Sequence, residues 1–205
     1  MGRAISVLQS GGRGKRGLFR EGILIVALKP TIYKIKIALS DIDRAYYDTL
    51  DLTVAQHPSE TPERMMVRVL AFCLNAQDNL VFTNGLSAVD EPDIWARGLE
   101  GEIALWIDVG EPTLERIKKA VRQAPLVKVY SFNSKSDRWW ADGRAKFNAL
   151  KAAIFQFQWG NIQALAALVE RRMDLSITVQ SDTAYVAAGL GECEVSWSVL
   201  QPTPV

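Results

Sequence analysis

Carboxylates are the residues of this sequence with the clearest potential for chemistry. Asp108 is the only charged residue in the apolar run ALWIDVG, Glu63 lies beside an apolar helical pattern, and the run DEPD contains Asp90, Glu91 and Asp93. Two or three converging carboxylates with open positions are what a hard cation such as Mg²⁺ requires. Such an ion can activate a bound water and stabilise charge on a phosphate during transfer. Whether these carboxylates converge depends on the elements that carry them.

Asp108 lies near the end of a strand predicted over 103–110, whose two alternation faces are both apolar. Such a strand belongs inside a sheet that is covered on both sides. A helix at about 112–124 and a strand over 126–132 follow, and this order predicts a crossover between parallel strands. The carboxyl ends of parallel strands share the edge where open α/β sheets bind ligands. The alternative is that Asp108 caps the helix or accepts hydrogen bonds from the turn.

Glu63 lies in a helix predicted over 61–76, with Thr61 as the N-cap and Pro62 at the first helical position. At helical spacing Glu63 falls on the apolar side, one turn before the apolar residues that continue it, and Glu60 lies near its edge. A carboxylate on a core-facing stripe needs a partner or a metal ion. The alternative is that Glu63 favours the helix dipole and reaches water.

The DEPD run belongs to a segment, 86–102, that we expect to be irregular or a short helix, and acidic turns often serve solubility alone. His57 is the sole histidine, which excludes a histidine-based metal site or a Ser-His-Asp triad with a spare partner. The glycines near the start lack the spacing of a phosphate-binding loop. The carboxylates therefore remain the main candidates.

The rest of the chain indicates a mixed α/β fold. Residues 31–39 and 48–56 alternate as two antiparallel strands, and a meander of alternating strands ends the chain. Between them we expect a helix over 138–151, a strand over 153–159 and a helix over 161–173. The order predicts a mixed sheet flanked by helices, with antiparallel strands at both ends.

Composition describes an ordinary globular protein, with 48% hydrophobic and 23% charged residues among 205. We expect a single domain over 26–205 and a monomer. We expect it in the cytoplasm because no apolar run suits a membrane span or a signal peptide. Residues 1–25 are expected to be a disordered extension or a mis-annotated start. Without them, 19 basic and 22 acidic residues leave a net charge of −3. Any nucleic-acid binding would then need a local basic patch.

Six segments together resemble the YaeQ family of bacterial proteins: ALKPTIYK, HPSETPERMM, DEPDIW, LWIDVG, RIKKA and NSKSDRWW. The resemblance covers roughly residues 26–202. Members of this family typically begin with Met followed by a segment like ALKPTIYK, so the resemblance supports Val26 as the true start.

The resemblance implies a variation on the PD-(D/E)XK nuclease fold, whose core runs helix, three strands, helix, strand. It implies Glu63 as the helix acid, Asp90 or Glu91 as the first motif acid and Asp108 as the second. Glu63, Asp90 and Asp108 would then hold Mg²⁺ or Mn²⁺ in a nuclease or phosphodiesterase acting on DNA or RNA. The motif lysine is missing, because position 110 is Gly110, so Lys118 or Lys119 would have to replace it. The alternative is a non-catalytic module that binds nucleic acid or a protein and keeps the nuclease-like fold.

Overall fold

The structure is a computed structural model that describes residues 29–84 and 90–203, with ten strands and four helices in these ranges. The predictions for residues 1–25 lie outside the described residues. The helices are α1 (Pro62–Leu74), α2 (Leu114–Gln123), α3 (Ser136–Phe147) and α4 (Trp159–Ala167). The strands are β1 (Thr31–Asp41), β2 (Tyr46–Gln56), β3 (Leu80–Phe82), β4 (Ile94–Arg97), β5 (Ile103–Val109), β6 (Leu126–Ser131), β7 (Ala153–Phe157), β8 (Arg172–Gln180), β9 (Thr183–Ala188) and β10 (Gly191–Gln201).

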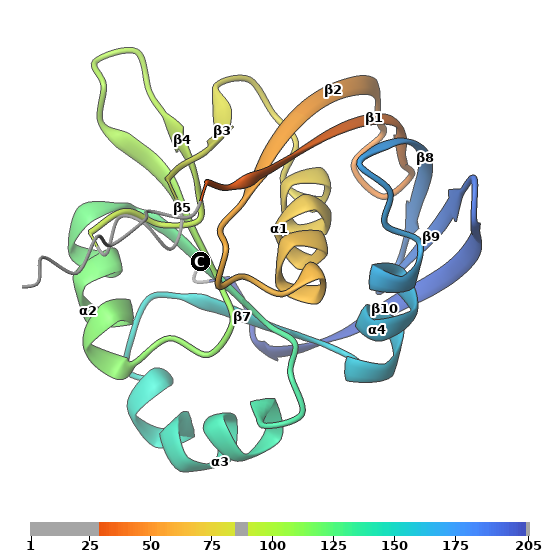
Figure 1. Ribbon diagram of the computed structural model, residues 1–205. Coiled ribbons are helices and arrows are strands. Elements are labelled where there is room, and N and C mark those ends of the chain that lie inside the picture. The colour runs from red at the N-terminus through yellow and green to blue at the C-terminus, as the bar shows by residue number, and fades with distance from the viewer. Residues whose placement is uncertain (1–28, 85–89, 204–205) are drawn as a thin grey trace, which may run out of the picture.

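All ten strands join one mixed sheet in the order β2-β1-β8-β9-β10-β7-β6-β5-β4-β3. The predicted antiparallel pair β1–β2 and the antiparallel series β8-β9-β10 are confirmed, and β1 joins them through parallel pairing with β8. The sheet curves until it is nearly barrel-shaped, and α1 lies inside the curve (Figure 1). The mixed sheet is thus confirmed, but it wraps around one helix instead of lying open between helices.

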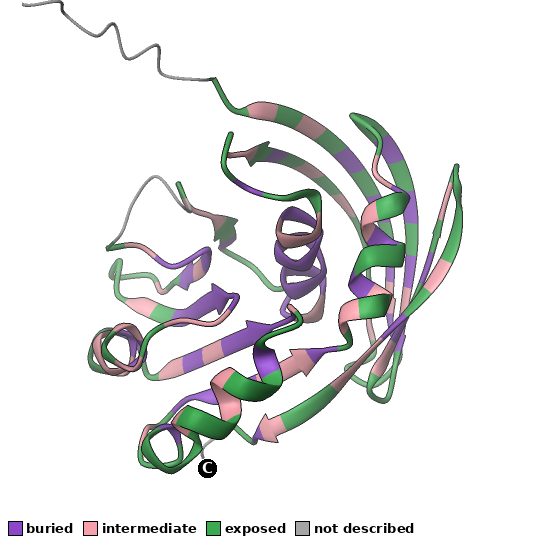
Figure 2. Ribbon diagram, turned by 60° about the horizontal axis from the view of Figure 1, so that its bottom comes forward, coloured by how far each residue is buried: buried purple, intermediate pink, exposed green. Residues whose placement is uncertain are grey.

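Helix α1 is the most deeply buried helix, as its colouring in Figure 2 makes visible. Its start is as predicted: Thr61 is the N-cap and accepts a hydrogen bond from the Arg64 amide, and Pro62 opens the helix. Nine of its residues are buried, and Met65, Met66 and Leu70 are among the largest fully buried side chains. The apolar cluster inside the curved sheet therefore forms around α1.

A second apolar cluster lies on the other face of β5, β6 and β7, beneath α2 and α3. Trp106 of β5 packs there with Ile117 and Ala120 of α2. Strands β5 and β6 are parallel, as the sequence predicts, and β5 is covered on both sides. Asp108 shares the Trp106 face of its strand, so its side chain is directed toward α2.

Two predictions of local structure are wrong. The segment 86–102 contains β4, which pairs with β5 through all four of its residues and with β3 through three of them. The helix expected to continue to Met173 ends at Ala167, because Arg172 already pairs with Lys34 of β1 and begins β8. In both places long-range pairing overrides a weak local pattern. No helix within the described ranges is long and apolar enough to cross a membrane.

Candidate functional site

Asp108 lies at the carboxyl end of β5 and is 2% exposed. Its two carboxylate oxygens accept hydrogen bonds from Arg116 of α2, at 2.7 Å from Nη2 and 3.0 Å from Nε. Arg116 also donates to the Glu91 carbonyl at 2.7 Å. Burial raises the pKa of the Asp108 carboxyl above its ordinary value, Arg116 opposes that rise, and the negative charge of Asp93 adds to it.

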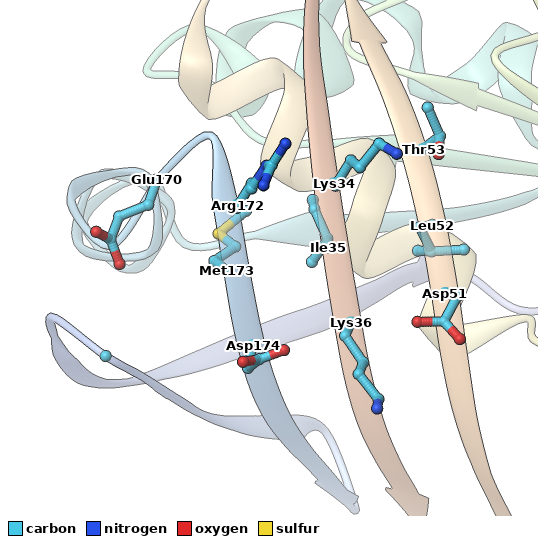
Figure 3. A pocket seen from close by; sticks show the side chains of 11 residues that line it. Lys34, Ile35, Lys36, Asp51, Leu52, Thr53, Glu170, Arg172, Met173 and Asp174 are labelled. Carbon is cyan, nitrogen blue, oxygen red and sulfur yellow. The ribbon is translucent and has the colours of Figure 1, made fainter.

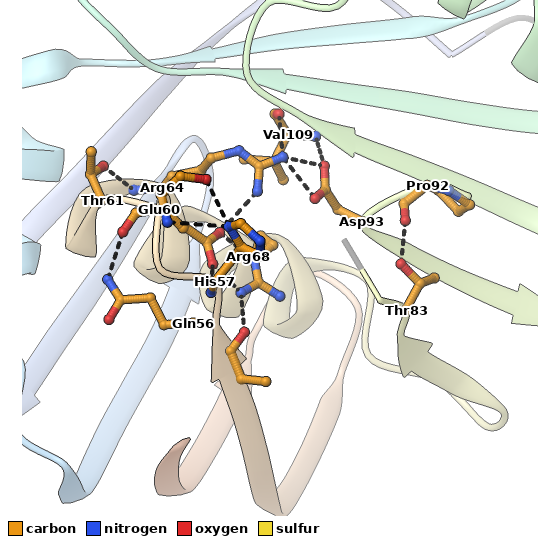
Figure 4. A network of polar contacts seen from close by, with 12 residues as sticks. Gln56, His57, Glu60, Thr61, Arg64, Arg68, Thr83, Pro92, Asp93 and Val109 are labelled. Carbon is orange, nitrogen blue, oxygen red and sulfur yellow. Dashed lines mark hydrogen bonds and ion pairs between the residues drawn. The ribbon is translucent and has the colours of Figure 1, made fainter. Parts of the chain in front are cut away.

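Asp93 is the second buried carboxylate at this edge, with 3% of its surface exposed. It immediately precedes β4, and its carboxylate accepts a hydrogen bond from the Val109 amide at 2.8 Å. The Arg64 guanidinium of α1 donates to both of its oxygens, at 2.8 and 2.9 Å (Figure 4). Helix α1 and the ends of β4 and β5 are therefore tied together by charge.

Glu60 joins this network just before α1 and is 7% exposed. Its carboxylate accepts from Arg64 at 2.9 Å and from two nitrogens of Arg68, at 2.7 and 2.8 Å. It also accepts from the His57 amide at 3.3 Å (Figure 4). Burial alone would lower the pKa of Arg64, but Asp93 and Glu60 together raise it above the ordinary value. Arg64 thus stays charged between two carboxylates.

The candidate residues from the sequence occupy several different places. Asp108 lies in the buried cluster, and Asp93 of the DEPD run lies beside it, whereas Asp90 is exposed and bonds Lys119 of α2. The pKa of Asp90 is lowered by this contact with Lys119. The remaining candidates are peripheral: Glu63 is half-buried on α1, Glu91 accepts from Asn84 at 3.2 Å, and Lys118 pairs with Glu115 at 2.9 Å.

Sequence reasoning did not assign the two arginines that hold these carboxylates. Arg64 lies four residues after Glu60 and four before Arg68, which is the spacing of neighbours on a helix face and was an available signal. Arg116 lies eight residues after Asp108, across a turn, and no local pattern marks that distance. Identifying this pair required the tertiary structure.

The donor set does not fit a Mg²⁺ ion in this arrangement. Every carboxylate oxygen of Asp93 and Asp108 already accepts a hydrogen bond from an arginine. Within the described part of the chain, no group of three or more His, Cys, Asp or Glu side chains is placed to hold a metal ion. As arranged here, the cluster therefore neutralises its acids by guanidinium groups.

A groove of about 640 Å³ lies away from this cluster, over strands β1, β2 and β8 (Figure 3). Lys34, Lys36 and Arg172 line it together with Asp51, Asp174 and Glu170, so its charges balance. All six side chains are exposed; Glu170 comes from the segment between α4 and β8, and the other five come from strands of the sheet. The groove contains none of the carboxylates that the sequence singled out, and a balanced surface of this kind is typical of a solvated sheet face.

Comparison with known proteins finds the same fold along nearly the whole chain. The family profile described as YaeQ protein matches residues 26–197. The protein called "Uncharacterized protein YaeQ" is 36% identical in Escherichia coli (strain K12) and 37% identical in Salmonella typhi, each over 178 residues, 86% of this chain and 98% of the relative. The crystal structure of YaeQ protein from Xanthomonas axonopodis pv. citri is 35% identical, with a TM-score of 0.82 over 85% of this chain and 99% of that one. The YaeQ structure from Pseudomonas syringae is 31% identical, with a TM-score of 0.81 over 84% and 97%.

Proposed function

This chain belongs to the YaeQ family, and from that premise we propose that it binds the phosphate backbone of nucleic acid through α2 without cleaving it. The names of the relatives carry no activity, so the proposal depends on the geometry of this chain. The observation that carries it is the occupation of both buried edge carboxylates by arginine. The basic surface of α2 beside them supplies the binding function.

The topology supports descent from a nuclease-like core. Helix α1 is followed by the antiparallel strands β3, β4 and β5, then by α2, and then by β6 parallel to β5. This order of helix, three strands, helix and strand matches the PD-(D/E)XK core that the family resemblance implies. Asp93 and Asp108 lie where β4 begins and β5 ends, which is consistent with the two acidic strand positions of such a core.

The arginines support binding without catalysis. Arg64 holds Asp93 and Arg116 holds Asp108, and a metal ion would have to displace both guanidinium groups to reach the carboxylates. Gly110 stands where the motif lysine would be. Both arginines keep part of their side chains exposed, 18% for Arg64 and 28% for Arg116. The positive charge of such partly exposed guanidinium groups can still attract a phosphate.

Helix α2 forms the local basic patch that a slightly acidic domain would need. Its ten residues include Arg116, Lys118, Lys119 and Arg122 against a single acid, Glu115. Arg122 is exposed, and the side chains of Lys118 and Lys119 are 37% and 42% exposed. Lysine and arginine side chains on such a surface bind phosphates by releasing counterions, with no requirement for a metal ion.

Fluorescence polarisation with labelled single-stranded and duplex oligonucleotides, in excess EDTA, tests the proposal. We expect the triple variant Lys118→Gln, Lys119→Gln, Arg122→Gln to lose affinity. On duplex DNA, the slope of log K against log salt should be shallower by about 2 to 3, at about 0.9 for each phosphate that the variant no longer neutralises. The matched control on α3 is Arg138→Gln, Arg144→Gln, Lys146→Gln, which removes three exposed cations from another helix. This control should keep most of the affinity.

Two results would contradict the proposal. Equal losses in the α2 and α3 variants would mean that α2 is no specific binding surface. Cleavage of the same oligonucleotides in Mg²⁺ or Mn²⁺, present in the wild-type chain and lost in Asp108→Asn, would instead favour the metal-dependent nuclease. A thermal-shift titration of both proteins with Mn²⁺ distinguishes the two functions directly, because a metal that binds the folded state raises the melting temperature.

A further inference from the structure

A small pocket of about 170 Å³ lies at the carboxyl end of α1, between the β1–β2 turn, β6 and β10. We call it the Lys128 pocket, after the lysine of β6 that lines it. Tyr130 lies two residues further along the same strand and also lines the pocket, together with Leu74, Phe155 and Trp197. An apolar cavity of about 150 Å³ is known to hold one benzene ring, so this pocket has room for a single flat ring.

Lys128 is a half-buried lysine whose ammonium group has a neutral hydrogen-bond partner. Its ammonium group donates to the Asn75 side-chain oxygen at 2.6 Å, a neutral partner. Among residues 29–84 and 90–203, no carboxylate lies within ion-pair distance of it. Its side chain is half-buried, and burial, with a smaller contribution from Arg44, lowers the pKa of Lys128. A partly desolvated cation without an anion is a costly arrangement unless a ligand supplies the counter-charge.

The neighbouring charges leave Lys128 as the cation in need of an anion. Asp41 is buried and is paired with Arg44 at 2.6 Å. Arg44 uses its other donors on the carbonyls of Cys73, in the last turn of α1, and of Ala76, just after the helix, at 3.1 Å each. These contacts satisfy the negative end of the helix dipole. Asp43 is exposed and also lines the pocket, so two acidic and two basic side chains line it in total. Asp41 and Arg44 pair with each other, and in the described part of the chain Lys128 is the cation of this lining that forms no ion pair.

Tyr130 provides a second donor beside this charge. Its hydroxyl oxygen accepts from the Asn75 amide at 2.8 Å, and within residues 29–84 and 90–203 the hydroxyl donates to no acceptor. Burial raises the pKa of Tyr130 to about 12, so the hydroxyl keeps that proton. The ring stacks on Phe155 with centroids 5.0 Å apart, and Phe157 connects this stack to Trp197. Aromatic side chains thus line the same pocket as a lysine and a hydroxyl that can both donate.

We propose that the Lys128 pocket binds a small planar monocarboxylate, such as an aromatic carboxylate, whose charge meets Lys128 and whose ring lies against Phe155 and Trp197. A single unpaired cation favours one negative charge over the two of a phosphate monoester. The site is separate from α2, so the inference does not depend on nucleic-acid binding. It assigns a ligand class to the carboxyl end of α1, where the sequence had suggested no site.

Calorimetric titration of the full chain with three ligands of nearly equal shape tests the charge requirement. Benzoate is the probe, benzamide its neutral counterpart and benzylamine its cationic counterpart. We expect saturable binding of benzoate that is at least about tenfold tighter than that of benzamide, since a hydrogen bond to a charged group exceeds a neutral one. Benzylamine should bind weakest. No saturable binding of benzoate at millimolar concentration, or equal binding of benzoate and benzamide, would overturn the proposal.

Variants locate the site. Lys128→Gln keeps a polar side chain and should lower benzoate affinity about tenfold, to the level of benzamide. Tyr130→Phe should lower it by a smaller factor, and Lys36→Gln, which removes an exposed lysine from the large outer groove, should leave it unchanged. Circular dichroism and thermal melting confirm that each variant is folded. Unchanged benzoate affinity in folded Lys128→Gln would refute the assignment, and the wild-type comparison of ligands stands even if that variant does not fold.

Discussion

The two ends of α1 carry charge in different ways. At its amino end, two carboxylates, Glu60 and Asp93, neutralise Arg64 and Arg68. At its carboxyl end, Arg44 donates to the carbonyls of Cys73 and Ala76, and Lys128 donates to the side-chain oxygen of Asn75 and has no ion pair within residues 29–84 and 90–203. The helix dipole favours the position of Glu60 just before α1 and that of Arg44 at its last turn. One end is therefore internally neutralised, and the other keeps an unpaired charge.

This difference assigns a separate role to each end of α1: the ion-pair network at the amino end stabilises the fold, whereas the Lys128 ammonium at the carboxyl end is available to a ligand. Removing one member of a closed buried network leaves its partner charged and without compensation, so such a network resists change. A lone half-buried cation costs stability in the free protein and can recover that cost when an anion binds. The amino end of α1 should thus dominate stability, while the carboxyl end should respond to solution conditions and ligands. Four predictions test this contrast.

The largest effect is expected from Glu60→Gln. This change leaves the Arg68 side chain, which is only 4% exposed, without its counter-ion. We expect a loss of about 3–5 kcal/mol in the free energy of unfolding, measured by urea denaturation. Glu63→Gln is the matched control three residues away, since Glu63 is half-buried and lies in the first turn, where its dipole interaction contributes about 1 kcal/mol or less. Equal losses in both variants would refute the distinction.

The pair of Asp108 and Arg116 should respond asymmetrically. Arg116→Met leaves a buried carboxylate unpaired and should cost about 3 kcal/mol. Asp108→Asn should cost about 1 kcal/mol or less, because the Arg116 side chain is 28% exposed and keeps its bond to the Glu91 carbonyl. Urea denaturation of both variants and of the double variant measures the coupling. The prediction is wrong if Asp108→Asn is the more destabilising change.

Asp108 should also add a pH dependence of known sign. Its folded pKa is raised, so the folded state binds the proton more tightly than the unfolded state does. Its contribution to stability is fully present below the ordinary aspartate pKa and is lost as the pH rises through the raised value. The stability of the wild-type chain relative to Asp108→Asn should therefore fall as the pH rises above the ordinary aspartate pKa of about 3.9. A relative stability that rises over this range would contradict the assigned direction.

The smallest effect is expected at the carboxyl end of α1. The folded pKa of Lys128 is lowered, so the unfolded state holds this proton more tightly. Stability should rise as the pH increases from the lowered pKa toward the ordinary lysine value, and Lys128→Met should remove that rise. Thermal melts of both proteins between about pH 7 and pH 10 measure it. Parallel curves for the two proteins would show that the Lys128 ammonium costs nothing in the fold.

Local sequence patterns determined much of the framework. The alternation in β1 and β2, the Thr61–Pro62 start of α1 and the doubly apolar strand β5 were all predictable. Each depends on residues close in sequence, since side-chain period and capping are properties of a single element. The position of Asp108 at the carboxyl end of a covered strand came from the same kind of pattern.

Tertiary structure alone decided which charges meet. The four residues of β4 are too few for a periodic signal, yet their pairing with β5 selects Asp93 over Asp90 as the buried acid. Arg64 reaches Asp93 across 29 positions, and Lys128 reaches Asn75 across 53. Such contacts form because a sheet of ten strands curves around α1. This curvature depends on pairing between strands that are far apart in sequence, so no short segment of the sequence predicts it. The sequence determined the elements and their candidate carboxylates, whereas long-range packing determined which of them are neutralised and which cation remains unpaired.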